Sequence, residues 1–265
     1  MEWTTNTLGR KIPVDIGGKT CAPFQGAFID RRKGGPKALS PERTSQAAPL
    51  RQKPDKRVAD WDDLFDRLDL RDGASISFHH HLRNGDKIVN EVVARLAARG
   101  LRDLTIVPTA LFPVHDALLP YIREGVVTKI EGSMNGAIGA ACSRGEIRRT
   151  CVLRSHGGRQ RAIQEGDISI DVAFIAAPAA DPYGNANGLF GPSACGPIGY
   201  AKPDSEYAGK VVVITDNLVP YPCAPWSIHG ANVDYVLKVE SIGDSSKIVS
   251  GTTQLTRSPT QLRIA

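Results

Sequence analysis

Three of the six histidines, His79, His80 and His81, stand in a row. They follow an apolar run (74–78) with the pattern of a β-strand. They precede a run (86–99) in which apolar residues recur at helical spacing. Ligands of open α/β sheets bind where a strand ends in such a loop, and a helix start offers N–H groups and a positive dipole end to an anion. With Arg83 beside it, this loop predicts half of a site for a carboxylate or a phosphate.

The same histidines admit two other interpretations. His79 and His81, two residues apart, could face one side of an extended segment and bind a metal, with His156 and Asp181 completing the ligand set. Alternatively, the histidines are hydrogen-bonded within the protein and contact no ligand. The anion interpretation is favoured because Arg83 and the helix start lie next to them.

A second polar loop, Ser155 to Gly158, follows a strand-like run at 151–154. Its two glycines let the backbone approach a ligand, and adjacent N–H groups could form an oxyanion hole for acyl transfer. A tight strand-to-helix turn explains the same residues equally well. Ser155 and His156 are not interpreted as a nucleophile and its base, because the G-x-S-x-G pattern is absent here.

A third polar loop, Asp181 to Gly188, follows the most apolar strand-like run, 168–177. Its Gly and Asn content predicts a shaped loop with left-handed turns. The carboxyl ends of parallel strands lie on one edge of a sheet, so we expect the three loops to converge on one crevice. In the next glycine-rich segment, Cys195 could be a reactive thiol, but a buried, inert cysteine is more typical.

The elements that would position these loops alternate between strand and helix patterns. This alternation predicts an α/β fold of three layers, with a mostly parallel sheet and helices on both faces. The expected strands span 74–78, 104–107, 126–130, 151–154, 168–177, 211–215 and 233–239, and the expected helices span about 60–70, 86–99, 114–122 and 159–164.

The composition is that of a soluble globular protein, with 41% hydrophobic and 23% charged residues among 265. No apolar run approaches the roughly 20 residues that cross a membrane, and the N-terminus lacks the pattern of a signal peptide. The five cysteines form no regular framework, which is typical of a reducing compartment. We therefore expect a cytoplasmic protein without a membrane partner.

The chain is expected to divide at residue 58. Residues 1–57 are predicted to be a basic, largely irregular arm, which the patch 24–28 would pin to the core, and residues 58–265 a single α/β domain. Much of the net charge of +5 comes from residues 31–57. This stretch is interpreted as a solvated arm or as a docking surface for an acidic protein. Nucleic-acid binding is disfavoured, because the stretch has no interleaved aromatic residues and no recognised motif.

From about residue 26 onward the sequence resembles the citrate lyase alpha chain family. The triple histidine and the string SACGP-x-GYA at 193–201 make the resemblance specific. The segments that carry it are 76–86, 132–136, 154–159, 181–188, 191–200 and 215–222.

The resemblance implies a coenzyme-A-transferase fold and a citrate:acetyl-carrier-protein transferase. Such an enzyme exchanges acetate for citrate on a thioester, and the implied ligands are citrate and the acetyl thioester. The thiol belongs to a coenzyme-A-like prosthetic group, phosphoribosyl-dephospho-CoA, carried by the gamma acyl-carrier chain. The beta chain then cleaves the citryl thioester to oxaloacetate and the acetyl thioester. No cofactor or metal is expected to be bound directly by this chain.

The resemblance and the loop chemistry together suggest roles for the site residues. N–H donors would stabilise the charge on a thioester oxygen, and arginines would hold the tricarboxylate. The candidate catalytic residues are His79, His80, His81, Ser155, His156, Gly157 and Gly158. The candidate substrate-binding residues are Arg83, Asn84, Gly85, Met134, Asn135, Arg159, Asp181, Tyr183, Gly184, Asn185, Asn187 and Gly188.

The family's alpha chain is about twice as long, with two related domains and the site between them. The glutamate nucleophile of related transferases would then lie in the second half. This chain is accordingly expected to be incomplete alone, as a truncated product, a split gene or the partner of a second-half polypeptide. The alternatives are a coenzyme-A transferase for another carboxylate and a non-catalytic fragment that binds the carrier protein or its sister chains. A metal-dependent hydrolase ranks last.

Overall fold

The computed structural model describes residues 2–5, 9–16, 18–20, 55–248 and 258–263. At its centre is an eight-stranded sheet in the order β14-β13-β10-β5-β6-β8-β7, with β9 paired to β8. Each of these strand pairs is parallel, as predicted. The strands are β5 (Ser75–Phe78), β6 (Leu104–Pro108), β7 (Ala110–Leu111), β8 (Val127–Met134), β9 (Val152–Leu153), β10 (Val172–Ala176), β13 (Lys210–Thr215) and β14 (Tyr235–Lys238).

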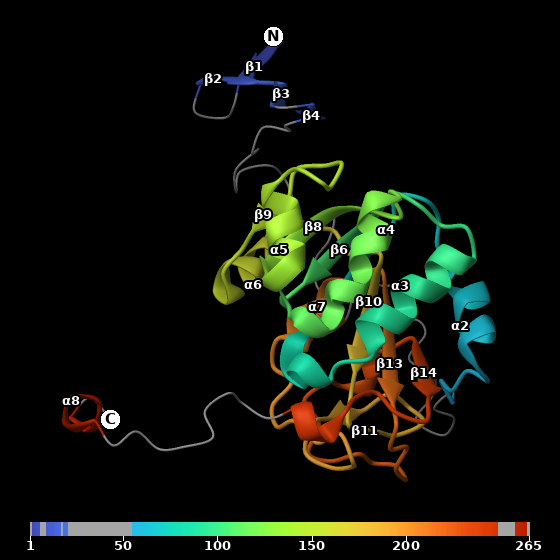
Figure 1. The fold of residues 1–265 in the computed structure, drawn as a ribbon. Coiled ribbons are helices and arrows are strands. Elements are labelled where there is room, and N and C mark those ends of the chain that lie inside the picture. The colour runs from blue at the N-terminus through green and yellow to red at the C-terminus, as the bar shows by residue number, and fades with distance from the viewer. Residues whose placement is uncertain (1, 6–8, 17, 21–54, 249–257, 264–265) are drawn as a thin grey trace.

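Helices cover both faces of this sheet, because the side chains of its strands alternate between two apolar cores. On β10, Val172 and Phe174 belong to one core, whereas Ala173 and Ile175 belong to the other. The first core takes residues from α2 (Trp61–Leu68), α3 (Ile88–Ala98), η4 (Pro113–Leu118), α4 (Leu119–Arg123) and α5 (Gly136–Ser143), and the second from α6 (His156–Gln164) and α7 (Ala201–Tyr207). The predicted three-layer architecture is confirmed (Figure 1).

Helix ends follow the local sequence. The side chain of Asp60 accepts a hydrogen bond from the N–H of Asp63 and caps α2. Gly100, with a φ of +85°, ends the turn after α3, as its position after the apolar repeat predicted. The expected helix 114–122 is divided into η4 and α4, and Pro120 lies in the first turn of α4, where its missing N–H would have no intrahelical partner.

The predicted boundaries differ most from the structure at three places. The strand expected over 168–177 is regular only over 172–176, although Ile168 and Ile170 are buried ahead of it. β8 continues to Met134, four residues beyond the expected end. Gly157 and Gly158, expected in a turn before a helix, lie inside the first turn of α6, so that helix begins three residues early.

The described part of the N-terminal arm contains two short antiparallel pairs, whereas the sequence predicted a largely irregular arm. β1 (Trp3–Thr5) pairs with β2 (Lys11–Pro13), and β3 (Asp15–Ile16) pairs with β4 (Lys19–Thr20). The patch 24–28 and most of the basic stretch 31–57 lie outside the described residues.

The chain joins the sheet at residues 56–58. The N–H of Val58 donates to the carbonyl of Val236 at 3.0 Å. Two residues earlier, Lys56 Nζ donates to the carbonyls of Gly230 and Val233, each at 2.6 Å. The remaining elements are η3 (His80–Gly85), β11 (Ala179–Ala180), β12 (Ala186–Asn187), η5 (Gly230–Asn232), η6 (Ser245–Lys247) and α8 (Pro259–Leu262). Among the described helices, none is long and apolar enough to span a bilayer.

Candidate functional site

The carboxyl ends of three parallel strands bring side chains together. His80 follows β5, Thr109 follows β6 and His156 follows β9. The ring centroid of His80 lies 4.9 Å from that of His156 and 5.4 Å from that of Tyr200. The His156 and Tyr200 centroids are 4.8 Å apart. The predicted convergence is therefore confirmed for the histidine loop and the Ser155 loop.

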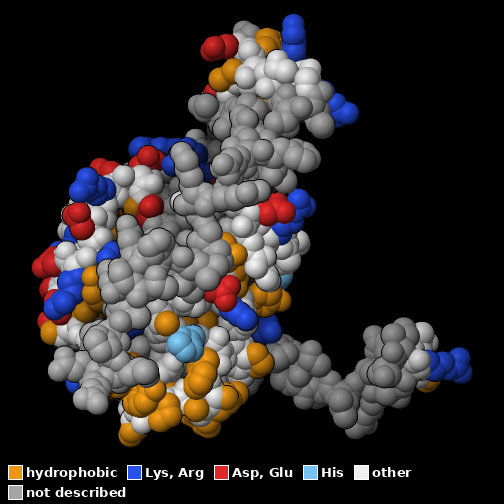
Figure 2. Space-filling model, turned by 180° about the vertical axis from the view of Figure 1, so that it is seen from behind, with side chains coloured by type: hydrophobic (Ala, Val, Ile, Leu, Met, Phe, Trp, Pro, Cys, Tyr) orange, Lys and Arg blue, Asp and Glu red, His pale blue; other side chains and the backbone are white. Residues whose placement is uncertain are grey.

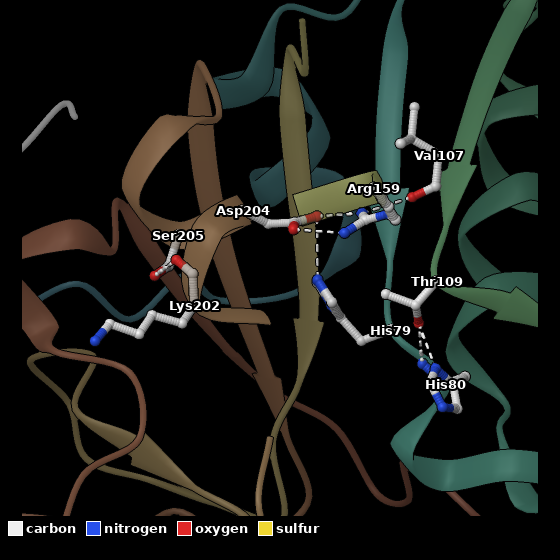
Figure 3. A network of polar contacts seen from close by, with 8 residues as sticks. All are labelled: His79, His80, Val107, Thr109, Arg159, Lys202, Asp204 and Ser205. Atoms are coloured by element: carbon white, nitrogen blue, oxygen red, sulfur yellow. Dashed lines mark hydrogen bonds and ion pairs between the residues drawn. The ribbon is translucent and has the colours of Figure 1, made fainter. Parts of the chain in front are cut away.

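Thr109 holds His80 in place through two contacts. The backbone N–H of His80 donates to Thr109 Oγ1 at 2.8 Å, and His80 Nδ1 lies 2.6 Å from the same oxygen (Figure 3). Burial, followed by the nearby charges of His156 and Arg83, lowers the pKa of His80 to about 4. The ring is consequently a neutral imidazole at neutral pH.

His81 is held by the adjacent strand. Its Nε2 lies 2.6 Å from the carbonyl of Ala176 at the end of β10, so Nε2 carries the hydrogen. Burial, with a smaller contribution from His79, lowers the pKa of His81 to about 3. Like His80, this ring stays neutral, and its Nδ1 presents a lone pair.

His79 belongs to a buried network that joins β5 to two helices (Figure 3). Its Nε2 lies 3.1 Å from Asp204 Oδ2 on α7. Arg159 on α6 binds the same carboxylate, with Nη1 at 2.8 Å from Oδ1 and Nη2 at 2.5 Å from Oδ2. Its Nη2 also donates to the carbonyl of Val107. Burial alone would raise the pKa of Asp204, but the charges of Arg159 and His79 lower it overall.

This network corrects the role expected of Arg159. Both terminal nitrogens of its guanidinium are committed to Asp204 and Val107, and the residue is 2% exposed. Arg159 therefore holds α6 against α7 and β6 instead of offering a free guanidinium to a substrate.

The start of α3 does not offer free N–H groups to an anion, contrary to the sequence-based expectation. The buried carboxyl of Asp86 accepts from the N–H of Ile88 at 2.7 Å and of Val89 at 3.1 Å. Burial raises the pKa of Asp86 to about 7, and the two N–H groups oppose that shift only in part. The protein's own carboxyl fills the place proposed for a ligand.

Arg83 remains available in the histidine loop. Within the described part of the chain its guanidinium makes no ion pair or hydrogen bond, and its backbone has a φ of 51° and a ψ of −132°. Non-glycine residues in such strained conformations cluster at functional sites. Asn84 is exposed, and a Cβ on Gly85 would lie 2.5 Å from the carbonyl of Asp244, so Gly85 serves close packing.

Ser155 caps the helix that carries His156. Its Oγ accepts the N–H of Gly158 at 3.1 Å, which leaves the N–H groups of His156 and Gly157 without a partner among the described residues. A Cβ on Gly157 would meet nothing within 4 Å. The helix end that follows β9, instead of the one that follows β5, thus presents open N–H donors beside His80.

The Asp181 loop uses its polar groups on itself. Asp181 is fully buried, and its two oxygens accept from the loop, at the N–H of Tyr183 and at Asn185, and from the N–H of Cys223. Asn185 Oδ1 accepts from Gly230, and Asn187 Nδ2 donates to Pro225.

These bonds shape the loop and tie it to 223–230, so the substrate-binding roles proposed for Asp181, Asn185 and Asn187 do not fit this geometry. The predicted left-handed turn is present at Gly184, whose φ is +90°. Gly188 is packed so closely that a Cβ there would lie 2.0 Å from the carbonyl of Gly196. Tyr183 makes an edge contact with Tyr221, with centroids 5.1 Å apart.

Met134 and Asn135 stand at the end of β8 on the same edge of the sheet. Asn135 Nδ2 donates weakly to the carbonyl of Leu111 at 3.3 Å. The next residue, Phe112, has its ring centroid 6.0 Å from that of His80. This pair therefore borders the histidine cluster without a contact that assigns it a role.

Exposed apolar side chains occur in the loops at this edge. Large ones, each 43–51% exposed, are Leu189, Phe190, Tyr200, Tyr221 and Trp226. Figure 2 shows hydrophobic side chains gathered at that end of the molecule. Such a patch is typical of a surface that meets another molecule.

The metal-binding set considered from the sequence is not assembled. Asp181 is buried in its own loop, and across the described ranges no cluster of three or more His, Cys, Asp or Glu residues could hold a metal ion. Burial raises the pKa of the Cys195 thiol to about 11, so it is protonated at neutral pH and is not an activated nucleophile.

Sequence reasoning missed Thr109, Tyr200 and Asp204. Thr109 had a usable signal, because it is a polar residue directly after a predicted strand. Tyr200 lies within a segment that carried the family resemblance. Asp204 had no such signal, because its partner Arg159 lies 45 residues away.

Comparison with known proteins supplies a family for this site. The family model described as citrate lyase, alpha subunit (CitF) matches residues 55–265. The citrate lyase alpha chain of Escherichia coli strain K12 is 41% identical over 227 residues, covering 85% of this chain and 44% of the relative. That of Klebsiella pneumoniae is 45% identical over 200 residues, covering 75% and 39%. The chain thus spans less than half the length of these relatives.

Solved structures agree on the fold. An alpha subunit of citrate lyase from Streptococcus mutans, in complex with citrate, superposes with a TM-score of 0.75 at 44% identity, covering 82% of this chain and 42% of that one. Glutaconate coenzyme A-transferase from Acidaminococcus fermentans, at 14% identity, gives a TM-score of 0.50 over 69% of this chain and 75% of its own. The predicted coenzyme-A-transferase-like fold is confirmed.

Proposed function

Because the chain belongs to the citrate lyase alpha-subunit family, we propose that it is a component of a cytoplasmic transferase that exchanges acetate for citrate on an acyl-carrier thioester. The observation that carries this proposal is the His80–His156 pair, 4.9 Å apart, at the open N-terminus of α6. A neutral donor ring and unpartnered N–H groups meet there, as stabilisation of a thioester oxyanion requires.

The exchange conserves charge and redox state. The carbon–sulfur bond of the acetyl thioester breaks and a carbon–sulfur bond to a citrate carboxyl carbon forms. Acetate leaves with an oxygen that came from citrate. Attack on the thioester carbon places negative charge on its oxygen, and loss of one fixed donor to such an oxygen costs about 3–4 kcal/mol of transition-state stabilisation. The N–H groups of His156 and Gly157 are the donors that this chain offers.

Citrate carries several negative charges, so its binding requires a cation. Arg83 lies in the histidine loop, and its guanidinium makes no ion pair or hydrogen bond with the described residues. A guanidinium binds a carboxylate through two parallel hydrogen bonds. We assign to Arg83 the capture of a citrate carboxylate that does not react, and to Arg159 the positioning of α6.

The proposed partners are the beta chain, the gamma acyl-carrier chain and a second-half alpha polypeptide. The coenzyme-A-like arm of the gamma chain, phosphoribosyl-dephospho-CoA, is a substrate in this scheme. The exposed apolar side chains at the carboxyl edge of the sheet support contact of this face with one of these molecules.

The test incubates acetyl-carrier protein and citrate with this chain, with and without a second-half polypeptide, and follows the citryl thioester by mass spectrometry. We expect citryl thioester in the completed mixture, and its loss with His80→Ala or Gly157→Val while both variants keep the fold. No citryl thioester in either mixture, with carrier binding intact, would favour a binding fragment. Transfer to another carboxylate in place of citrate would favour a different coenzyme-A transferase.

A further inference from the structure

The hydroxyl of Thr109 is buried between two groups of one histidine. Thr109 is 3% exposed, and its Oγ1 accepts the backbone N–H of His80 at 2.8 Å. A hydroxyl has one hydrogen to donate, and His80 Nδ1 lies 2.6 Å from the oxygen (Figure 3). Elsewhere in the described part of the chain this hydroxyl has no partner.

Only one arrangement satisfies every donor. If Nδ1 carried the hydrogen, Oγ1 would receive two donors and its own buried hydrogen would have no acceptor, which is costly. If Thr109 donates to Nδ1, both groups are satisfied and the ring hydrogen must sit on Nε2. Nε2 lies across the ring from Thr109, and the hydrogen bonds of His80 with the described residues involve only its backbone N–H and Nδ1.

We propose that Thr109 is a positioning residue that locks His80 in the Nε2–H tautomer, so that His80 donates a hydrogen bond to the thioester oxygen during transfer. The direction of donation and the substrate class rest on the proposed function. The tautomer rests on the contacts with Thr109 alone. His80 is then an electrostatic donor, comparable to a backbone N–H in an oxyanion hole, and is not a general base.

The surroundings of His80 agree with a neutral donor. Positive charge on His156, Arg83, His79 or Arg159 disfavours a proton on the ring, and the phenol of Tyr200, with its ring centroid 5.4 Å away, is uncharged at neutral pH. With a pKa of about 4, the ring is a poor base for work near neutral pH. A neutral ring with its hydrogen on Nε2 can still donate a hydrogen bond.

The tautomer is measured on the whole chain labelled with ¹⁵N at histidine. Two-bond ¹H–¹⁵N spectra separate the two tautomers and the imidazolium, and the signals missing from His80→Gln identify the ring. We expect Nε2–H at pH 7, unchanged down to about pH 5 and retained in Thr109→Ser. A ring that is Nδ1–H, charged or an even mixture at pH 7 in the unaltered chain would overturn the lock.

The catalytic half of the proposal is measured with the completed enzyme. Thr109→Val should lower kcat by about 100-fold, with the KM for citrate changed less than threefold, whereas Thr109→Ser should restore most of the rate. An Nε2–H ring together with an unchanged rate in Thr109→Val would overturn the role in transfer. If Thr109→Val does not fold, the tautomer of His80 is tested with Thr109→Ser and with the spectrum of the unaltered chain. The role of His80 as a donor is then tested by the pH profile of kcat. A fall of kcat with a pKa near 6.5 that belongs to His80 would overturn the donor role. If the completed enzyme makes no citryl thioester, the proposed function fails while the tautomer measurement stands.

Discussion

Arg159 and Asp204 form a bidentate ion pair, and their side chains are 2% and 0% exposed. Because Asp204 also lies 3.1 Å from His79 Nε2, one carboxylate connects α6, α7 and the end of β5. The position of His80 and His156 relative to each other depends on these elements. The ion pair therefore fixes α6, α7 and the end of β5 relative to one another, and its own side chains do not face a ligand.

Removal of this carboxylate should weaken the whole domain. Asp204→Asn leaves the Arg159 charge buried without its partner, and we expect a loss of about 3 kcal/mol in the free energy of unfolding. Urea unfolding at pH 7 measures it. The pKa of Asp204 is lowered in the folded protein, so its contribution is present above the unfolded pKa, near 4, and is lost as the pH falls further.

A matched control lies on the same helix. Arg161 and Glu165 form an ion pair at 2.9 Å with side chains that are 68% and 35% exposed. Glu165→Gln should change stability little, because solvent screens exposed pairs. Equal losses in Asp204→Asn and Glu165→Gln would contradict the structural role assigned to Arg159.

Asp86 should make stability fall as the pH rises. Its folded pKa, about 7, is above the unfolded value of about 4, so the folded chain holds the proton in between. The stabilisation is complete below about pH 4 and is lost as the pH rises through 7, with a slope of at most about 1.4 kcal/mol per pH unit. Asp86→Asn keeps an oxygen for the N–H groups of Ile88 and Val89 but cannot titrate, and its stability should depend less on pH.

Asp63 provides a control of opposite sign. Its hydrogen bond with Arg67 lowers its pKa, so Asp63→Asn should lose stability at neutral pH and lose none in acid. Thermal unfolding of both variants from about pH 2.5 to 7.5 makes the comparison, because Asp63 titrates only below its unfolded pKa of about 4. Parallel pH profiles for Asp86→Asn and the unaltered chain would show that Asp86 is ionised in the folded protein throughout.

The architecture was accessible from the sequence because it depends on local periodicity. Apolar runs such as 211–215 predict buried strands, and their alternation with helices predicts parallel pairing through βαβ connections. The meeting of His80 and His156 was accessible for a related reason, since parallel strands end on one edge. Neither inference needed the identity of a distant partner.

The errors concern polar groups whose partners were not visible in the sequence. From its position in the loop, Arg159 was expected to bind a ligand, but its guanidinium binds Asp204. Asp181 was likewise expected to line the crevice, but its carboxylate accepts the N–H of Cys223. The start of α3 is different, because an Asp at the beginning of a predicted helix often accepts the N–H groups two and three residues further on, and this could have been predicted. In each of these cases a group within the protein, instead of a ligand, satisfies the charged side chain.

Close backbone packing should make Gly188 intolerant of any side chain. A Cβ there would lie 2.0 Å from the carbonyl of Gly196, and a backbone oxygen cannot move away at low cost. We expect Gly188→Ala to lose about 2 kcal/mol of stability. At Gly199, on the same segment, a Cβ would meet nothing within 4 Å, so Gly199→Ala should unfold at the same urea concentration as the unaltered chain. Comparable losses in the two variants would mean that the contact with Gly196 relaxes easily.

Arg83 should lower the stability of the domain and at the same time be required for citrate binding. A φ of 51° with a ψ of −132° is strained for arginine and acceptable for glycine. Arg83→Gly should therefore gain about 1 kcal/mol of stability, after allowance for the added freedom of the unfolded chain. The same change removes the guanidinium proposed to hold citrate, so citrate affinity, measured calorimetrically with the completed enzyme, should fall at least tenfold. Asp69, with a φ of 47° and a ψ of 46° at the end of α2, is the control, since Asp69→Gly also relieves a positive φ without touching the site. If Arg83→Gly binds citrate as tightly as Asp69→Gly does, the strain at Arg83 has no connection with the substrate.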